Sequence, residues 1–202
     1  VECSRRTLLQ RQGQEGSVVH GLGGFATVLA FGSARLGITS DGIGTKIEVA
    51  ERVGRYDSLG HDLVAMVADD LIAGGVEPTN VVNILDVDHL DQQTVLALMQ
   101  GLESAAAVAG VSVVGGEIAE LGSRIAGFGP GMHFNWAATA IGVAIQDAFL
   151  NSPRAGDAIL ALPCLGLRSN GFSLARRILH RALGEDWHVQ PHLNSTWGNW
   201  LL

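Results

Sequence analysis

Residues 41–46, with the sequence DGIGTK, combine the residue types that bind phosphate groups in proteins. Two glycines let backbone amides crowd around an anion, and the hydroxyl and ammonium groups that follow can contact its oxygens. The acid at Asp41 would repel a bare phosphate, but it suits a divalent cation lying between the carboxylate and the phosphate. The Walker A spacing is absent, so an ordinary Asp-Gly turn is the alternative. The phosphate-binding interpretation depends on Gly42, Gly44, Thr45 and Lys46.

A second acid, Asp70, lies on the apolar side of a helix predicted over residues 57–73. It follows Leu63 by seven residues, so it projects into the apolar stripe of that helix. It also lies near the helix C-terminus, where the helix dipole disfavours an anion. A carboxylate in this position must be paired, protonated or bound to a metal. Asp62 and Asp69 point away from the stripe, and we expect them to be solvated.

A third acid, Glu117, follows a short strand predicted at residues 111–114. Loops after strands are a usual place for ligand groups in α/β proteins, although surface glutamates are also commonplace. Asp41, Asp70 and Glu117 together place three acids near the ends of elements in one domain.

The sequence GLRSNG at residues 166–171, at the start of a predicted helix, is a second candidate anion site. Ser169 and Asn170 can cap the helix that follows, and Gly171 lets an anion approach its free amides. Arg168 can add a bidentate contact to a phosphate. An ordinary helix cap with a surface arginine is the alternative.

Strands and amphipathic helices must position these residues. The N-terminal segment, residues 1–20, is predicted to be an arm or loop. Asp57 or Ser58 can cap the first helix, and Asp91 can cap the second, which ends at Gly110. The predicted strands of the first unit cover residues 36–40, 80–87, 111–114 and 137–145, and its helices cover 57–73 and 91–110.

A linker-like composition at residues 151–158, NSPRAGDA, separates a second unit from the first. The second unit has one predicted strand, 158–162, and one predicted helix, 171–183. Two such elements cannot bury their own apolar faces. We therefore expect a first domain over residues 1–150 and the beginning of an incomplete second domain over 151–202.

The composition narrows the classes of function. The chain has 202 residues, 47% of them hydrophobic, and a net charge of −7, which argues against a nucleic-acid partner because phosphate binding needs clustered cations. Cys3 and Cys164 lie far apart and form no CxxC motif, which favours a reduced, cytoplasmic protein. No apolar run approaches the length of a membrane span, so no membrane partner is expected.

The sequence GLGGFA at residues 21–26 matches one form of the dinucleotide-binding fingerprint. The apolar run before it is short, and Gly32 would interrupt the helix that must follow. A nicotinamide- or flavin-dependent oxidoreductase is therefore a distant alternative.

Five stretches together resemble the phosphoribosylformylglycinamidine cyclo-ligase family, also called aminoimidazole ribonucleotide synthetases. The resemblance runs from about residue 13 to residue 183 and covers the order and separation of the motifs. The motifs are GLGGF, SDGIGTKIEVA, GHDLVAMVADDLIAGGVEP, VVGGEIAEL and GLRSNGFSLARR.

The resemblance implies an α+β or α/β fold with a mixed-sheet, ATP-binding first domain that pairs into a dimeric β-barrel, followed by a second α/β domain. It implies a homodimer that uses ATP and Mg²⁺. It further implies that ATP phosphorylates the formyl oxygen of formylglycinamidine ribonucleotide, a phosphorylated ribonucleotide substrate. An internal amine then closes the imidazole ring, and ADP and phosphate leave.

The resemblance also assigns roles to residues of this sequence. Asp41, Lys46 and Asp70 would be catalytic. Asp41, Asp70 and Glu117 would hold Mg²⁺ on ATP. The nucleotide would be bound by Gly23, Gly24, Gly42, Gly44, Thr45 and Lys46, and the substrate phosphate by Arg168, Ser169, Asn170 and Gly171.

Two positions depart from the family pattern, in which a histidine usually stands in place of Arg168 and Asn-Asp in place of Asp69-Asp70. The chains of the family also continue well beyond residue 202. Two alternatives follow: a related kinase or synthetase with another substrate, and an inactive paralogue kept as a dimeric nucleotide-binding module.

Overall fold

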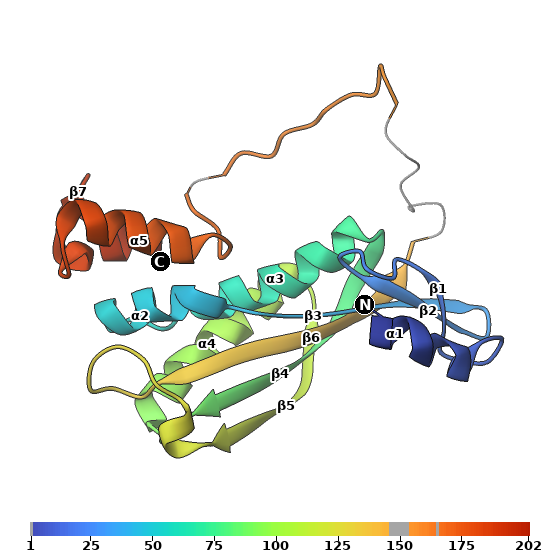
Figure 1. The fold of residues 1–202 in the computed structure, drawn as a ribbon, viewed down its shortest axis with the longest axis horizontal. Coiled ribbons are helices and arrows are strands. Elements are labelled where there is room, and N and C mark those ends of the chain that lie inside the picture. The colour runs from blue at the N-terminus through green and yellow to red at the C-terminus, as the bar shows by residue number, and fades with distance from the viewer. Residues whose placement is uncertain (1, 146–153, 165) are drawn as a thin grey trace.

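A six-stranded mixed sheet forms the centre of the computed structural model, which describes residues 2–145, 154–164 and 166–202 (Figure 1). The strand order is β1-β2-β3-β6-β4-β5, and only the β4–β5 pair is parallel among the described strands. The strands are β1 (Ser17–His20), β2 (Thr27–Phe31), β3 (Ala34–Gly42), β4 (Val76–Val87), β5 (Ser112–Glu120) and β6 (Phe134–Ala144).

Helices cover one face of this sheet. Helix α3 (Leu59–Ala73) lies across β3, β6 and β4, and α4 (Gln92–Ala109) lies beside α3 and β5. Both predicted helices are confirmed. Asp91 caps α4 by accepting the Thr94 amide at 2.8 Å, and Gly110 ends it in a left-handed conformation. Ser58 precedes α3 without a side-chain capping hydrogen bond. None of the described helices is long and apolar enough to cross a membrane.

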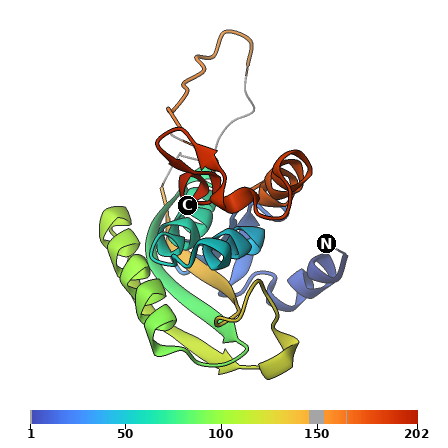
Figure 2. The same ribbon diagram turned by 90° about the vertical axis from the view of Figure 1, so that its left-hand side faces the viewer.

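The remaining described elements lie at the two ends of the chain and in the turns between strands and helices. Helix α5 and the segment after it lie beside α2 (Figures 1 and 2). These elements are α1 (Glu2–Thr7), η1 (Leu8–Arg11), η2 (Gly44–Lys46), α2 (Ile47–Val53), η3 (Gly122–Arg124), α5 (Phe172–Leu183), η4 (Trp187–Val189), β7 (Pro191–His192), β8 (Ser195–Thr196) and α6 (Trp197–Leu201).

Helix α2 belongs to two apolar cores at once. Ile47 and Ala50 pack into the core between the sheet and its helices. Val49, on the other side of the helix, packs with Phe172 and Trp187 into a smaller core beneath α5. A helix of seven residues is marginal in water, so this two-sided burial is what stabilises α2.

The other face of the sheet is apolar and exposed. Along β4 the side chains alternate, with Val81 and Leu85 buried but Ile84 53% exposed. Ile141 and Val143 of β6 project on the same open side, at 40% and 48% exposure. The sheet therefore presents a continuous apolar surface opposite its helices.

Several sequence predictions are wrong. Residues 1–20 form α1, η1 and β1 instead of an irregular arm. The run after GLGGFA is strand β2, which turns at Gly32 into β3, so the helix that a dinucleotide site needs does not exist. Strand 111–114 continues to Glu120, so Glu117 lies inside a strand.

The second unit also differs from its prediction. Residues 158–162 form no strand, and Ile159 is 96% exposed there because no described strand lies beside it. The predicted helix 171–183 is confirmed as α5. The C-terminal residues, for which the sequence pattern indicated no element, form η4, a short β-hairpin and α6. The predicted domain boundary at residue 150 lies outside the described residues.

Candidate functional site

A cavity of about 630 Å³ lies between α3 and the turn that precedes α5. Carboxylates dominate the polar groups around it. Asp41 comes from the end of β3, and three further acids come from α3. The charged lining residues are Asp41, Asp62, Asp69, Asp70 and Arg168.

Lys46 and Asp62 form a buried ion pair beside this cavity. The Lys46 ammonium lies 2.9 Å from one carboxylate oxygen of Asp62 and 2.8 Å from the other, and the two side chains are 5% and 12% exposed. The Ser169 hydroxyl donates to the same carboxylate at 2.7 Å. The ammonium also lies over the Phe172 ring, 5.3 Å from its centroid. Asp62 therefore joins the turn at 44–46 to the turn before α5.

The prediction that Asp62 is solvated is thus wrong. The spacing of Ser58, Asp62 and Met66 by four residues places them on one side of α3, and that side faces the cavity. This spacing was the available sequence signal. The sequence could not show that a lysine from another element would reach Asp62.

Arg168 is ion-paired with Asp69. Asp69 comes from α3 and Arg168 from the turn before α5, and both line the cavity. The predicted phosphate ligand Arg168 therefore already contacts an anion of the chain. Of the three other predicted ligands, Ser169 and Asn170 line the cavity, whereas Gly171 precedes α5 with φ of 86° and is not among the lining residues.

Asp41 and Asp70 have no cationic partner among the described residues. Asp41 accepts the amide of Gly42 at 2.7 Å, and Asp70 accepts the Thr39 hydroxyl at 3.4 Å. Burial raises the pKa of Asp70 above its ordinary value, and the nearby charge of Asp41 raises it further, while Thr39 opposes both. The charge of Asp41 is therefore close enough to disfavour the ionisation of Asp70.

Glu117 does not join these two acids. Glu117 pairs with Ile84 of β4, which pairs with Ala137 of β6, which in turn pairs with Gly42 of β3, next to Asp41. Three interstrand spacings, about 14 Å, therefore separate the backbones of Glu117 and Gly42. Side chains alternate along a strand, so Glu117 projects from the open face and Asp41 from the helix face. In the described part of the chain, no three His, Cys, Asp or Glu residues are placed to hold a metal together. The predicted three-acid metal site is therefore wrong in its third member.

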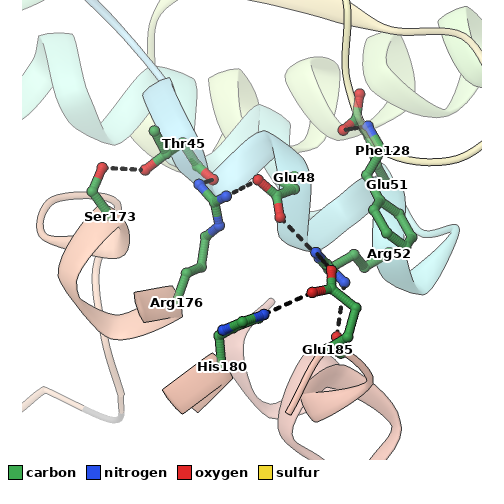
Figure 3. A network of polar contacts seen from close by, with 9 residues as sticks. All are labelled: Thr45, Glu48, Glu51, Arg52, Phe128, Ser173, Arg176, His180 and Glu185. Carbon is green, nitrogen blue, oxygen red and sulfur yellow. Dashed lines mark hydrogen bonds and ion pairs between the residues drawn. The ribbon is translucent and has the colours of Figure 1, made fainter. Parts of the chain in front are cut away.

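The turn at 41–46 contacts α5 through Thr45. The Thr45 hydroxyl lies 3.0 Å from that of Ser173, and Arg176 donates to the Thr45 carbonyl at 3.5 Å (Figure 3). Gly44 has φ of 65°, a conformation that favours glycine. A side chain at Gly42 would approach the Trp136 carbonyl to 3.1 Å, so close strand packing explains this glycine.

The predicted nucleotide glycines Gly23 and Gly24 lie in the turn between β1 and β2, where the Gly24 amide donates to the carbonyl of Gly21 at 2.7 Å. Neither lines the cavity. The same turn still reaches the site indirectly, because the Phe25 carbonyl accepts the Thr39 hydroxyl that also contacts Asp70.

A charged network fixes α5 and the residues after it to α2 (Figure 3). Arg52, with 6% of its side chain exposed, contacts Glu48 at 2.9 Å and Glu185 at 3.0 Å. Its guanidinium lies 3.9 Å from the centroid of the Phe128 ring, and Arg176 forms a second ion pair with Glu48. Sequence analysis did not find this network, because Arg52 and Glu185 lie 133 positions apart and match no motif.

Two solved structures share the mixed sheet with helices on one face. One is AaThiL complexed with AMPPCP and TMP, with 16% identity, a TM-score of 0.51, and coverage of 70% of this chain and 40% of that one. The other is tt0281 from Thermus thermophilus, with 23% identity, a TM-score of 0.50, and coverage of 60% and 37%.

The family model for the AIR synthase related protein, N-terminal domain, matches residues 23–144, and the chain belongs to this family. Phosphoribosylformylglycinamidine cyclo-ligases are similar along the whole chain: that of Thermococcus kodakarensis is 36% identical over 204 residues, and that of Pyrococcus furiosus 34%. The alignments cover 100% of this chain but 58% of each relative, so the chain spans little more than half of their length.

The buried ion pair generates a prediction about stability. Asp62→Ala leaves the Lys46 ammonium buried without a counter-ion, and we expect it to lower the free energy of unfolding by about 3–5 kcal/mol. The exposed pair of Arg55 and Asp57 offers a matched control, because Asp57→Ala should cost less than about 1 kcal/mol. Urea denaturation measures both, and equal effects would contradict the burial of the Lys46–Asp62 pair.

The raised pKa of Asp70 generates a prediction about pH. Between its ordinary pKa, about 4, and its higher folded value, the folded chain binds more protons than the unfolded chain, so stability falls as pH rises through this window. Asp70→Asn should remove this fall and melt at a higher temperature near pH 7. Thermal melts across the window, with Asp57→Asn as the charge-matched control, measure it. A pH dependence as steep as that of the unmodified chain would contradict the prediction.

Proposed function

We propose that the protein performs ATP-dependent ring closure of formylglycinamidine ribonucleotide to aminoimidazole ribonucleotide, the reaction for which its relatives are named. One observation supports this most directly. A single cavity is lined both by the acids Asp41 and Asp70 and by the turn that contains Arg168 and Asn170. A metal-bound nucleotide and a phosphorylated substrate would therefore meet in one place.

Magnesium fits the residues that are present. Asp41 and Asp70 are neighbouring carboxylates without a cationic partner among the described residues, and burial, together with the charge of Asp41, raises the pKa of Asp70. A divalent ion held by the two carboxylates would neutralise charge on the ATP phosphates. The amide of Gly44 would contact the nucleotide phosphates, since the amides of Gly42 and Ile43 already donate to Asp41 and to the Trp136 carbonyl. Lys46 would act indirectly, because its pairing with Asp62 fixes this turn.

The chemistry begins with transfer of the terminal phosphoryl group of ATP to the formyl oxygen, which releases ADP. The internal amine then attacks the activated carbon, and phosphate leaves as the ring closes. Arg168, Ser169, Asn170 and Gly171 would hold the ribonucleotide's own phosphate during both steps. Because guanidinium stays protonated, Arg168 cannot serve as the base that accepts the amine proton.

We also propose a homodimer formed through the open face of the sheet. Exposed branched residues of β3, β4 and β6 form this apolar surface, and a monomer would leave it in water. Pairing two such sheets would produce a closed barrel. The surface lies next to the nucleotide turn, because Ser40, which directly precedes Asp41 in β3, lines a second, smaller cavity with Ile84 and Thr139.

The proposed second domain starts after residue 150. Its exposed apolar stretch at 158–162 and the exposed residues Leu174 and Ile178 of α5 suit elements that pack within a larger unit. Both cysteines are free and exposed, which is compatible with the reducing cytoplasm as the site of action.

ADP release that depends on formylglycinamidine ribonucleotide tests the proposed function. We expect the protein to release ADP with this substrate and Mg·ATP, and not without it. ADP release with only a different acceptor would support a related kinase or synthetase. Nucleotide binding without any turnover would support an inactive paralogue.

The metal proposal is tested separately by binding. Asp41→Asn and Asp70→Asn should each weaken Mg·ATP by more than about tenfold, because each removes one charged ligand of the ion. Glu117→Gln is the matched control, and its affinity should be unchanged because Glu117 lies on the other face of the sheet. Titration calorimetry measures all three, and unchanged affinity in both aspartate variants would end the metal proposal.

The dimer is tested by replacing an apolar residue on the open face with a charged one. Ile84→Asp places a charge in the centre of the proposed interface, and we expect it to convert a dimer into a monomer at micromolar concentration. Leu96→Asp, on the exposed side of α4 at 55% exposure, is the control and should leave the dimer intact. Light scattering measures the molar mass. A monomeric unmodified chain, with ATP present, would contradict the proposal.

A further inference from the structure

Arg168 is the only lysine or arginine among the described residues that line the large cavity, and it is already ion-paired there. Its guanidinium contacts the carboxylate of Asp69 on α3. Lys46 lies behind the wall, where Asp62 already neutralises it. Any anion that enters the cavity therefore meets Arg168 already engaged with a carboxylate of the chain.

The two ion pairs of the site differ in how easily they exchange. The side chains of Arg168 and Asp69 are 66% and 49% exposed, whereas those of Lys46 and Asp62 are 5% and 12% exposed. For an exposed pair, the equilibrium constant between the paired and the separated ions favours pairing by a factor of about five at most, because water solvates both ions when they separate. Separation of the buried pair would leave an unsolvated charge. The Arg168–Asp69 pair is thus the one that a ligand can open.

We infer that Asp69 is a specificity-determining residue that occupies Arg168 while the cavity is empty and is exchanged for the phosphate group of the substrate. The inference deepens the proposed function and depends on it. A phosphate dianion carries more charge than a carboxylate and accepts two parallel hydrogen bonds from a guanidinium. The released Asp69 returns to water at little cost.

The neighbouring donor supports the same exchange. The side-chain amide of Asn170 lines the cavity, and its hydrogen bond is to the sulfur of Met66 at 3.8 Å, which is a weak partner. A phosphate beside Arg168 would offer this amide a stronger acceptor. A ligand with only a carboxylate would gain little, because it would replace Asp69 with an equivalent group. Asp69 thereby selects phosphorylated ligands over carboxylic acids.

Titration calorimetry of the full chain with ribose 5-phosphate, in magnesium-free buffer, tests the inference. Asp69→Asn should tighten binding by about two- to fivefold, because Arg168 then has no internal anion to release. Asp57→Asn is the matched control: it changes the net charge equally, breaks an exposed pair with Arg55, and lies at the opposite end of α3. Its affinity should equal that of the unmodified chain.

A double variant separates exchange from simple charge repulsion. In an Arg168→Ala background, Asp69→Asn should no longer tighten binding, and equal tightening there would overturn the exchange. Unchanged affinity of the single Asp69→Asn variant would also overturn the exchange. If Arg168→Ala nevertheless binds ribose 5-phosphate more weakly, the proposed phosphate site is retained. If neither the unmodified chain nor any variant binds ribose 5-phosphate, the phosphate site and the inference both fail.

Discussion

The buried ion pair of Lys46 and Asp62 is the interaction on which the rest of the site depends. An ammonium that is almost fully buried needs a carboxylate beside it, so the pair holds the turn after β3 against α3. The Ser169 hydroxyl binds the same carboxylate and fixes the turn before α5. Helix α2 follows directly from Lys46, and its burial in two cores extends the constraint to the C-terminal segment.

This pairing also determines the charge balance of the cavity. Lys46 neutralises Asp62, and Arg168 neutralises Asp69, so the remaining negative charge is concentrated on Asp41 and Asp70. Their mutual repulsion contributes to the raised pKa of Asp70. The buried Lys46–Asp62 pair holds the turn after β3 against α3, and the exposed Arg168–Asp69 pair is the one that we propose a ligand opens.

Much of the fold could be predicted from the sequence, because caps and apolar periodicity are local signals. Asp91 and Gly110 bounded α4 correctly, and the motif order identified the family. The failures have non-local causes. Glu117 follows a Gly-Gly pair that resembles a strand end, but pairing with β4 continues the strand through it. Residues 158–162 have strand propensity, but no described strand pairs with them. The partners of Asp62 and Arg168 come from elements far away along the chain, which no local pattern records.

Anomalous scattering from Mn²⁺ tests the central claim most directly, that Asp41 and Asp70 form the one unbalanced pair of acids among the described residues of the cavity. Crystals of the full chain would be grown with Mn²⁺ and a non-hydrolysable ATP analogue, since manganese takes the same oxygen ligands as magnesium. We expect an anomalous peak between the carboxylates of Asp41 and Asp70, with the Lys46–Asp62 pair intact. A peak on Asp62 or Asp69, or bound nucleotide with no metal near either expected acid, would contradict the claim.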